Sequence, residues 1–196
     1  MNVTKGKNLI GGSVMKAIGK IAKVVTKIVE VSHWVAVALM AAATVCSAVY
    51  PEWVKYFVGF DAKECCGAEL SVYGFEIAAP VADGKVDMTA FLLFGIGATL
   101  ILALMALIFR NLNLVIKRSE GGTPFTADNV RSFRQVGIFS IAVPVVGMIV
   151  GSVAHLILGA ETSNSLGGFL IGIVVLCHTE FFVRGIELEK DVDGLV

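Results

Sequence analysis

Two pairs of histidine and carboxylate side chains stand out, because both lie in otherwise apolar sequence. Glu30 and His33 are three residues apart, so a helix places them on one face. His178 and Glu180 form a second pair near the other end of the chain. Imidazole and carboxylate groups bind metal ions, and two histidines can serve as the axial ligands of a haem. These four residues are therefore candidate ligands in a membrane redox protein. The alternative is that they hydrogen-bond to one another and order the helices, because no zinc- or haem-type spacing is present.

Four long apolar stretches must position these residues. They cover residues 29–50, 90–109, 136–158 and 166–183, and each is close to the ~20 residues that a helix needs to cross a ~30 Å hydrocarbon core. A mean hydropathy of +0.82 and 56% hydrophobic residues agree with this interpretation. The sequence therefore predicts an all-α membrane protein with four transmembrane helices in one domain, 29–196. At about 1.5 Å per residue, His33 and His178 would lie ~6 Å and ~8 Å inside their span ends, at matching depths.

The lysines and arginines are distributed unevenly between the two sides of the membrane. Only three of the sixteen, Lys55, Lys63 and Lys85, lie in the segments 51–87 and 159–165, which leaves thirteen on the opposite side. The positive-inside rule therefore predicts that both termini and the segment between the second and third spans are cytoplasmic. The expected location is the bacterial inner membrane, so the lipid bilayer is the first expected partner.

Residues 1–28 are predicted to form a cytoplasmic amphipathic helix. Lys16, Lys20, Lys23 and Lys27 fall at helical spacing on one face. Such a helix is expected to lie on the inner leaflet and to lead into the first span, either as an anchor or as a docking element. The segment does not read as a signal peptide, because its basic part is long and the apolar run that follows has full span length.

The segment 51–87 is too long for a simple connection and is predicted to form a small extracellular cap. A short interfacial helix is expected near its start, where four aromatic residues recur at helical spacing: Trp53, Tyr56, Phe57 and Phe60. Residues 69–79 are expected to form an extended or hairpin element. The cap either receives a ligand or only shields the helices. Cys46 and Cys177 are too far apart in depth to bridge. The alternatives for Cys46 are a bridge to the adjacent pair Cys65 and Cys66, a link between chains, or a simple packing role.

Two glycine pairs predict close packing between the third and fourth spans. Gly147 and Gly151 form a small-xxx-small pair, and Gly168 and Gly172 form another. The link between these spans is short, so the helices should be antiparallel neighbours whose glycine faces meet. The alternative is that a glycine face supports a homo-oligomer. Pro144 is expected to kink the third span.

The cytoplasmic segment before the third span is the most distinctive part of the sequence. Gly121, Gly122 and Pro124 predict a turn, after which Thr126 is a suitable N-cap for a new helix. Arg131 and Arg134 then lie at the headgroup level, opposite an acidic tail after the fourth span. The tail's carboxylates are Glu187, Glu189 and Asp191. We expect the turn, the arginines and the tail to form a surface for a cytoplasmic partner.

This segment and the tail resemble a bacterial membrane family. The matching residues are Gly122-Thr-Pro-Phe-Thr126, Asn129-Val-Arg131 with Arg134 and Gly137, and the ending 184–193, which reads Arg-Gly-Ile-Glu-Leu-Glu-Lys-Asp-Val-Asp. The family is the uncharacterised one called domain of unknown function 2975, and the similarity covers nearly the whole chain beyond the cationic start. The resemblance implies four spans and a gene neighbour that encodes a small helix-turn-helix regulator, and hence a cytoplasmic regulatory partner.

Enzymatic motifs do not appear in the sequence. There is no nucleophile elbow, phosphate-binding loop, metalloprotease helix or zinc-ligand spacing. The basic residues are explained by lipid headgroups, so no direct contact with nucleic acid is expected. The sequence therefore favours a non-enzymatic sensor or regulatory membrane protein without a cofactor. The alternatives are the metal- or haem-binding redox protein and a small oligomeric channel or carrier.

Overall fold

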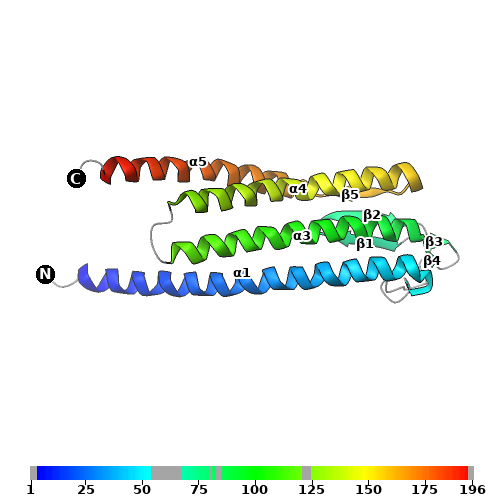
Figure 1. Ribbon diagram of the computed structural model, residues 1–196, viewed down its shortest axis with the longest axis horizontal. Helices are drawn as coiled ribbons and strands as arrows, with labels where there is room; N and C mark the ends of the chain where they lie inside the picture. Colours follow the sequence, from blue (N-terminus) through cyan, green and yellow to red (C-terminus); the bar gives the residue numbers. More distant parts are fainter. Residues whose placement is uncertain (1–3, 54–67, 80, 83–84, 121–124, 194–196) are drawn as a thin grey trace.

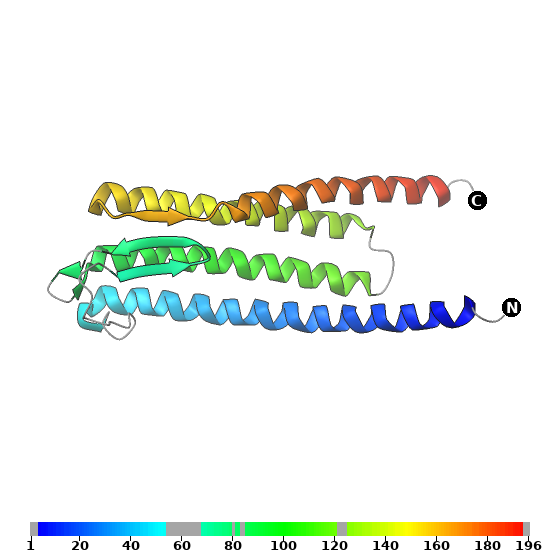
Figure 2. The same ribbon diagram turned by 180° about the vertical axis from the view of Figure 1, so that it is seen from behind.

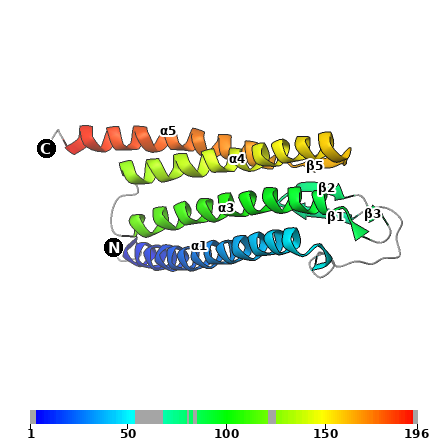
Figure 3. The ribbon, with the colours of Figure 1, turned by 45° about the vertical axis from the view of Figure 1, so that its right-hand side comes forward.

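The computed structural model describes residues 4–53, 68–79, 81–82, 85–120 and 125–193. Four long helices run side by side: α1 (Thr4–Val49), α3 (Met88–Ser119), α4 (Ala127–Leu158) and α5 (Gly167–Asp193). A short 3-10 helix, η1 (Pro51–Trp53), follows α1. The helices pack in chain order, α1 on α3, α3 on α4 and α4 on α5. They therefore form a row with α1 and α5 at its two edges (Figures 1 and 3).

All four helices are long and apolar enough to cross a membrane, which confirms the four predicted spans. The apolar parts are Ile18–Val49, Met88–Ser119, Ala127–Leu158 and Gly167–Leu188. Each is longer than the ~20 residues that a membrane crossing requires. The fold is that of an integral, multi-pass membrane protein.

The two ends of the row differ in charge and in secondary structure. We call one the basic end; it carries Lys20, Lys23 and Lys27 on α1, Arg110, Lys117 and Arg118 on α3, Arg131 and Arg134 on α4, and Arg184 on α5. We call the other the strand end, because the β-strands lie there (Figure 1). Between Glu30 and the strand end, α1 has no charged residue, and α3 has none between Asp87 and Arg110.

Side chains before two helices fix where those helices begin. Asp87 accepts hydrogen bonds from the backbone N–H groups of Thr89 and Ala90 at 2.7 and 3.1 Å, at the start of α3. Thr126 accepts one from the N–H of Asn129 at 3.3 Å, at the start of α4. The predicted N-cap role of Thr126 is confirmed, since each cap satisfies N–H groups that the first helical turn leaves without partners.

A three-stranded antiparallel sheet covers part of the row at the strand end. Its strands are β1 (Ala68–Val72), β2 (Phe75–Ala79) and β5 (Thr162–Asn164), in the order β1-β2-β5. A second small pair, β3 (Val81–Ala82) and β4 (Lys85–Val86), lies between β2 and α3. The hairpin expected within residues 69–79 is therefore confirmed. Figure 2 shows that the sheet lies alongside α3 and α4 and does not sit beyond the ends of the helices.

Successive side chains along a strand point to opposite faces of the sheet, and this explains why one face of the sheet packs on the helices. Phe75 and Ile77 point to the helices and are almost fully buried, at 1% and 0% exposure. The ring of Phe75 stacks on Phe94 of α3 with centroids 5.9 Å apart. Gly97 makes room, because a Cβ there would lie 2.9 Å from the Phe75 ring. The core of the strand end is thus shared by the sheet, α3 and α4.

The link between α4 and α5 doubles back along α4, which corrects the predicted glycine packing. Gly147 and Gly151 do not face α5: Gly147 contacts Asn164, and Gly151 contacts Thr162 of β5. The glycines of α5 do face α4, but they lie against residues closer to the basic end. Gly168 contacts Ser140 and Pro144, and Gly172 contacts Gly137 and Ile141. The reason is that α5 begins beside the middle of α4. Pro144 is buried in α4, and its predicted kink stays a prediction.

The cationic start of the chain continues directly into the first span. α1 is one helix from Thr4 to Val49, without a turn near the expected boundary at residue 28. The side chains of residues 4–17 lie outside the described part, so binding of this segment to the leaflet stays a prediction. The expected aromatic helix falls mostly on residues 54–67, which are also outside that part.

Candidate functional site

The tip of the β1–β2 hairpin meets α1 at His33, in the middle part of the row (Figure 2). Val72 pairs with Phe75, so Tyr73 and Gly74 form a two-residue turn. Both have positive φ angles, +49° and +77°, as such tight hairpin turns require. Asparagine or glycine is the usual residue at the first position, and a tyrosine there is rare. The turn directs the Tyr73 side chain along the helices, away from the strand end.

The hydroxyl of Tyr73 hydrogen-bonds to Nε2 of His33. His33 is 8% exposed, and its ring lies between two aromatic rings, with centroids 5.7 Å from Tyr73 and 5.4 Å from Phe109 of α3. Its Nδ1 is 2.7 Å from the carbonyl oxygen of Val29. A carbonyl only accepts, so Nδ1 carries a proton. In the neutral ring Nε2 is then the acceptor, and Tyr73 donates to it.

Glu30 lies one helical turn from His33 and is also buried, at 7% exposure. Its Oε2 accepts a hydrogen bond from Nζ of Lys27 at 3.0 Å, and the lysine head is more than half exposed. Glu30 and His33 therefore lie on one face of α1, as predicted, and this face is covered by other parts of the protein. The site joins a buried histidine, a buried carboxylate and the tip of a distant hairpin.

The link between α4 and α5 packs against the same turn and hydrogen-bonds to it. The backbone N–H of Ser165 donates to the carbonyl oxygen of Gly74 at 2.9 Å, and a Cβ at Gly74 would lie 2.5 Å from the Cβ of Ser165. Asn164 donates from Nδ2 to the carbonyl oxygen of Pro144 at 2.7 Å. The hairpin tip is thus connected to α1 through Tyr73 and to α4 through the link that leads into α5.

The structure does not bring the two histidine pairs together. His178 and Glu180 are exposed on α5, and Nδ1 of His178 lies 2.8 Å from the carbonyl oxygen of Val174. α1 and α5 occupy opposite edges of the row, so His33 and His178 do not face each other within one chain (Figure 1). Among the described residues, no group of three histidine, cysteine, aspartate or glutamate side chains is placed to hold a metal.

Most of the expected partner surface is exposed at the basic end. Arg131, Arg134, Glu187 and Asp191 are solvent-exposed, and the Glu189 side chain lies outside the described part. The ion pairs formed by the described residues are Lys23–Glu120 and Lys27–Glu30, and neither joins the arginines to the tail.

Aromatic packing joins the start of α4 to the tail helix instead. The rings of Phe125 and Phe133 lie 5.5 and 4.7 Å from the ring of Phe182, and Phe125 covers Gly185. The expected proximity of the turn and the tail is therefore found at Phe125, although charge does not hold it. Sequence reasoning missed these phenylalanines because their spacing also fits ordinary lipid-facing positions.

Cys46 and Cys177 are free thiols, so the expectation that they do not pair is confirmed. Cys65 and Cys66 lie outside the described residues.

The fold and the site define a helical membrane protein with a β-hairpin packed alongside its spans. No family model, no curated protein and no solved structure matches the chain. The resemblance to domain of unknown function 2975 therefore stays a prediction.

Proposed function

We propose that this chain is a non-enzymatic regulatory protein of a bacterial inner membrane, with both termini in the cytoplasm. In this proposal the hairpin enters from the outer side and responds to an external signal, and the basic end binds a cytoplasmic regulator of the helix-turn-helix type. The single observation that carries the proposal is the hydrogen bond between Tyr73 and His33. The family resemblance at Thr126, Arg131 and Arg134 supports it.

The position of this contact along α1 is what makes it suited to transmission. His33 is sixteen residues from the end of α1 at Val49, which is ~24 Å along a helix. It is only three residues from Glu30, the first charged residue toward the basic end. The hairpin belongs to the segment that connects α1 and α3 at the strand end. Its tip therefore extends along most of the uncharged part of α1.

The energies involved are sufficient for a two-state device. Loss of the Tyr73 hydroxyl would leave the buried Nε2 of His33 without its partner, which costs roughly 1–3 kcal/mol. A bulky residue held at positive φ stores of order 1–3 kcal/mol of strain. A signal that relaxes the turn would therefore release the backbone strain at Tyr73 and lose the hydrogen bond to His33, so the two free energies partly cancel. Two arrangements of similar free energy are the requirement for a population shift.

The test is quantitative co-purification from native membranes. We expect Tyr73→Phe and Arg131→Glu each to lower recovery of the cytoplasmic partner at least tenfold, because the first removes the transmitting contact and the second changes the binding surface. His178→Ala is the matched control, since His178 is exposed and does not contact the hairpin. Recovery of the same proteins at the same stoichiometry from all four preparations would refute the proposal.

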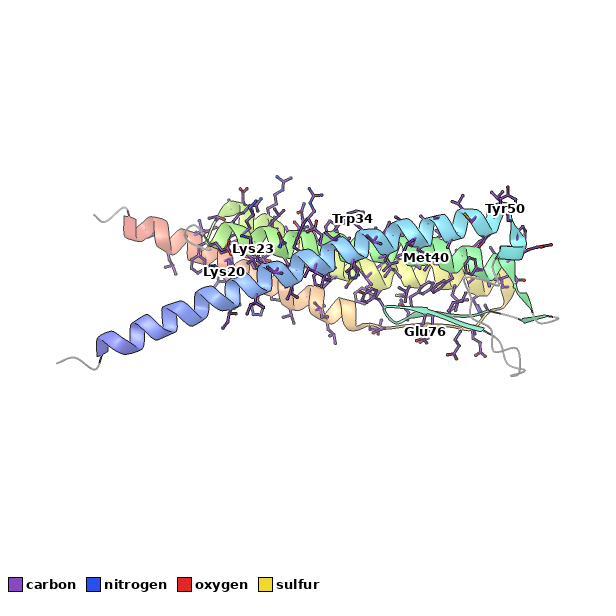
Figure 4. The ribbon with its side chains drawn as sticks, turned by 90° about the horizontal axis from the view of Figure 1, so that it is seen from below. Lys20, Lys23, Trp34, Met40, Tyr50 and Glu76 are labelled. Atoms are coloured by element: carbon purple, nitrogen blue, oxygen red, sulfur yellow. The ribbon has the colours of Figure 1, made fainter. Side chains whose placement is uncertain are left out.

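One further observation favours an oligomeric channel as the second candidate. Ser71, Glu76 and Ser163 form a row across the three strands, and all three side chains are exposed. Figure 4 shows Glu76 on the side of the sheet that faces away from the helices. The neighbouring Phe75 packs on Gly97, nine residues and ~14 Å from the start of α3 at Met88, which is membrane depth. Carboxylates at this depth normally line water-filled paths.

Cation flux into liposomes tests this second candidate. The wild-type protein should conduct, Glu76→Gln should lower the flux at least tenfold, and Glu161→Gln should not, because Glu161 is exposed outside the row. Liposomes containing the wild-type protein that show no flux above empty ones would remove the channel.

A further inference from the structure

A buried histidine lies in the uncharged part of α1. From residue 31 to residue 49 the titratable side chains of this helix are His33 and Cys46, and residues 88–109 of α3 have none. His33 is 8% exposed, and both of its ring nitrogens have hydrogen-bond partners. An ionisable side chain inside a membrane is costly, so it usually belongs to a functional site, often a proton path. Histidine suits such a path because its ring can take up a proton at one nitrogen and lose one from the other.

Toward the basic end, His33 is next to a second buried titratable group. Glu30 is one helical turn away at 7% exposure, and side chains three residues apart on a helix are neighbours. Nδ1 of His33 points in this direction, since it is 2.7 Å from the carbonyl oxygen of Val29. The Glu30 carboxylate in turn accepts a hydrogen bond from Lys27, whose head is more than half exposed. One carboxylate therefore separates His33 from the solution at the basic end.

Toward the strand end, His33 is bonded to a side chain that reaches an exposed polar surface. The Tyr73 hydroxyl hydrogen-bonds to Nε2 of His33, and Tyr73 is 49% exposed. Tyr73 lies at the tip of the hairpin, where the outer face of the sheet begins. By the alternation of strand residues, the exposed polar side chains of this face are Glu69, Ser71, Glu76, Glu161 and Ser163. Ser71 donates to Glu76 at 3.3 Å, so neighbouring side chains on this face are hydrogen-bonded.

Water is the occupant that suits this polar face. The sheet lies alongside α3 and α4, and its other face packs on them through Phe75 and Ile77 (Figure 2). α5 begins beside Pro144 and therefore does not extend along the strand-end half of α4. Hydrocarbon chains cannot hydrogen-bond to carboxylates and hydroxyls, and such groups at membrane depth normally line water-filled paths. A chain of water along the sheet would connect the strand end to Tyr73.

We propose that this chain conducts protons across the membrane through Tyr73, His33 and Glu30. The Tyr73 hydroxyl passes its proton to Nε2 of His33 and takes another from the water, so the tyrosine stays neutral. The imidazolium then gives its Nδ1 proton to the Glu30 carboxylate, and tautomerisation of the neutral ring returns the remaining proton from Nε2 to Nδ1. Glu30 releases its proton to water at the basic end and again accepts from Lys27. The membrane potential or a pH difference drives the flow, so no other reactant is consumed. The path lies within one chain and depends neither on the regulatory function nor on an oligomer.

Proton flux into liposomes tests the path. The purified chain is reconstituted with a pH-sensitive dye inside, and a potassium gradient with valinomycin makes the interior negative. We expect the interior to acidify at least tenfold faster than in empty liposomes. Tyr73→Phe and Glu30→Gln should each lower the rate at least tenfold with unchanged helical circular dichroism, because each removes one proton-carrying group and keeps the side-chain size. His178→Ala is the matched control and should conduct like the wild type, since His178 is exposed on α5.

Chemical rescue gives a readout that a purely structural role of His33 would not produce. His33→Ala should lower the rate at least tenfold, and added imidazole should restore part of it, because the free base can enter the site and carry the proton. Replacement of external sodium by choline should leave the wild-type rate unchanged, which distinguishes this path from a channel for metal cations. Wild-type liposomes without proton flux above empty ones would overturn the proposal. Wild-type rates in His33→Ala or in Tyr73→Phe would overturn it as well.

Discussion

At the residue scale, both residues of the hairpin turn have left-handed backbone conformations. Among the described residues, Tyr73 is the one non-glycine residue with positive φ. Gly74 has positive φ as well and is pressed against Ser165. Gly159, at the C-cap of α4, has a similar φ of +63° but no atom within 4 Å of where a Cβ would be. The two glycines therefore separate the cost of backbone strain from the cost of a steric clash.

We predict that Gly159→Ala lowers the free energy of unfolding by roughly 1–2 kcal/mol, the cost of a Cβ in the left-handed region. Gly74→Ala should lower it by about 2–5 kcal/mol, because a clash of overpacking size adds to the same strain. Denaturant titration of both variants in one detergent measures the difference. Equal losses for the two variants would show that the hairpin tip does not pack on the α4–α5 link.

At the element scale, the start of α5 depends on the link that precedes it. Residues 159–166 run back along α4, and β5 within them pairs with β2. α5 therefore begins beside Pro144, so α4 meets β5 in the strand-end half of the row and α5 in the basic half. Close packing of the two helices is concentrated at Gly137 and Gly172, where a Cβ on Gly172 would lie 2.7 Å from the carbonyl oxygen of Gly137.

Disulfide trapping distinguishes this packing from the one expected from the glycine motifs. In a cysteine-free background, Gly137→Cys with Leu176→Cys should cross-link, because a Cβ at Gly137 lies 2.6 Å from Cγ of Leu176. The pair Gly151→Cys with Gly168→Cys should not, since Gly151 faces Thr162. Efficient cross-linking of the second pair without the first would restore the simple packing of two full-length spans.

The features that sequence reasoning predicted correctly depend on local chemistry. The spans follow from apolar length, the cap at Thr126 from one side chain and the adjacent N–H groups, and the hairpin from its short strands and central glycine. The bond between Tyr73 and His33 joins residues forty positions apart and depends on the hairpin lying back along the helices. The packing of Gly147 on Asn164 likewise depends on the path of the link. Neither path is encoded in a local pattern, so neither could be predicted.

At the scale of the whole molecule, the charge difference between the two ends predicts an orientation in the membrane. By the positive-inside rule we expect the basic end to be cytoplasmic. We therefore predict that a cysteine at Glu161 is labelled by an impermeant maleimide in intact cells, while one at Asp128 is labelled only after permeabilisation. Both side chains are exposed, which makes them a matched pair. If Asp128→Cys alone were labelled in intact cells, the orientation in the membrane would be the reverse of the predicted one.

The pairing of β2 with β5 also has a consequence for biosynthesis. Ile77 pairs with Thr162, and those residues leave the ribosome 85 positions apart, since 162 minus 77 is 85. Until β5 emerges, β1 and β2 form a two-stranded hairpin, which is marginally stable by itself. The hairpin must therefore wait while α3 and α4 are made, with the edge of β2 unpaired. The link between α4 and α5 closes the sheet, so a chain that ends at residue 158 has three of the long helices and a hairpin that lacks its third strand.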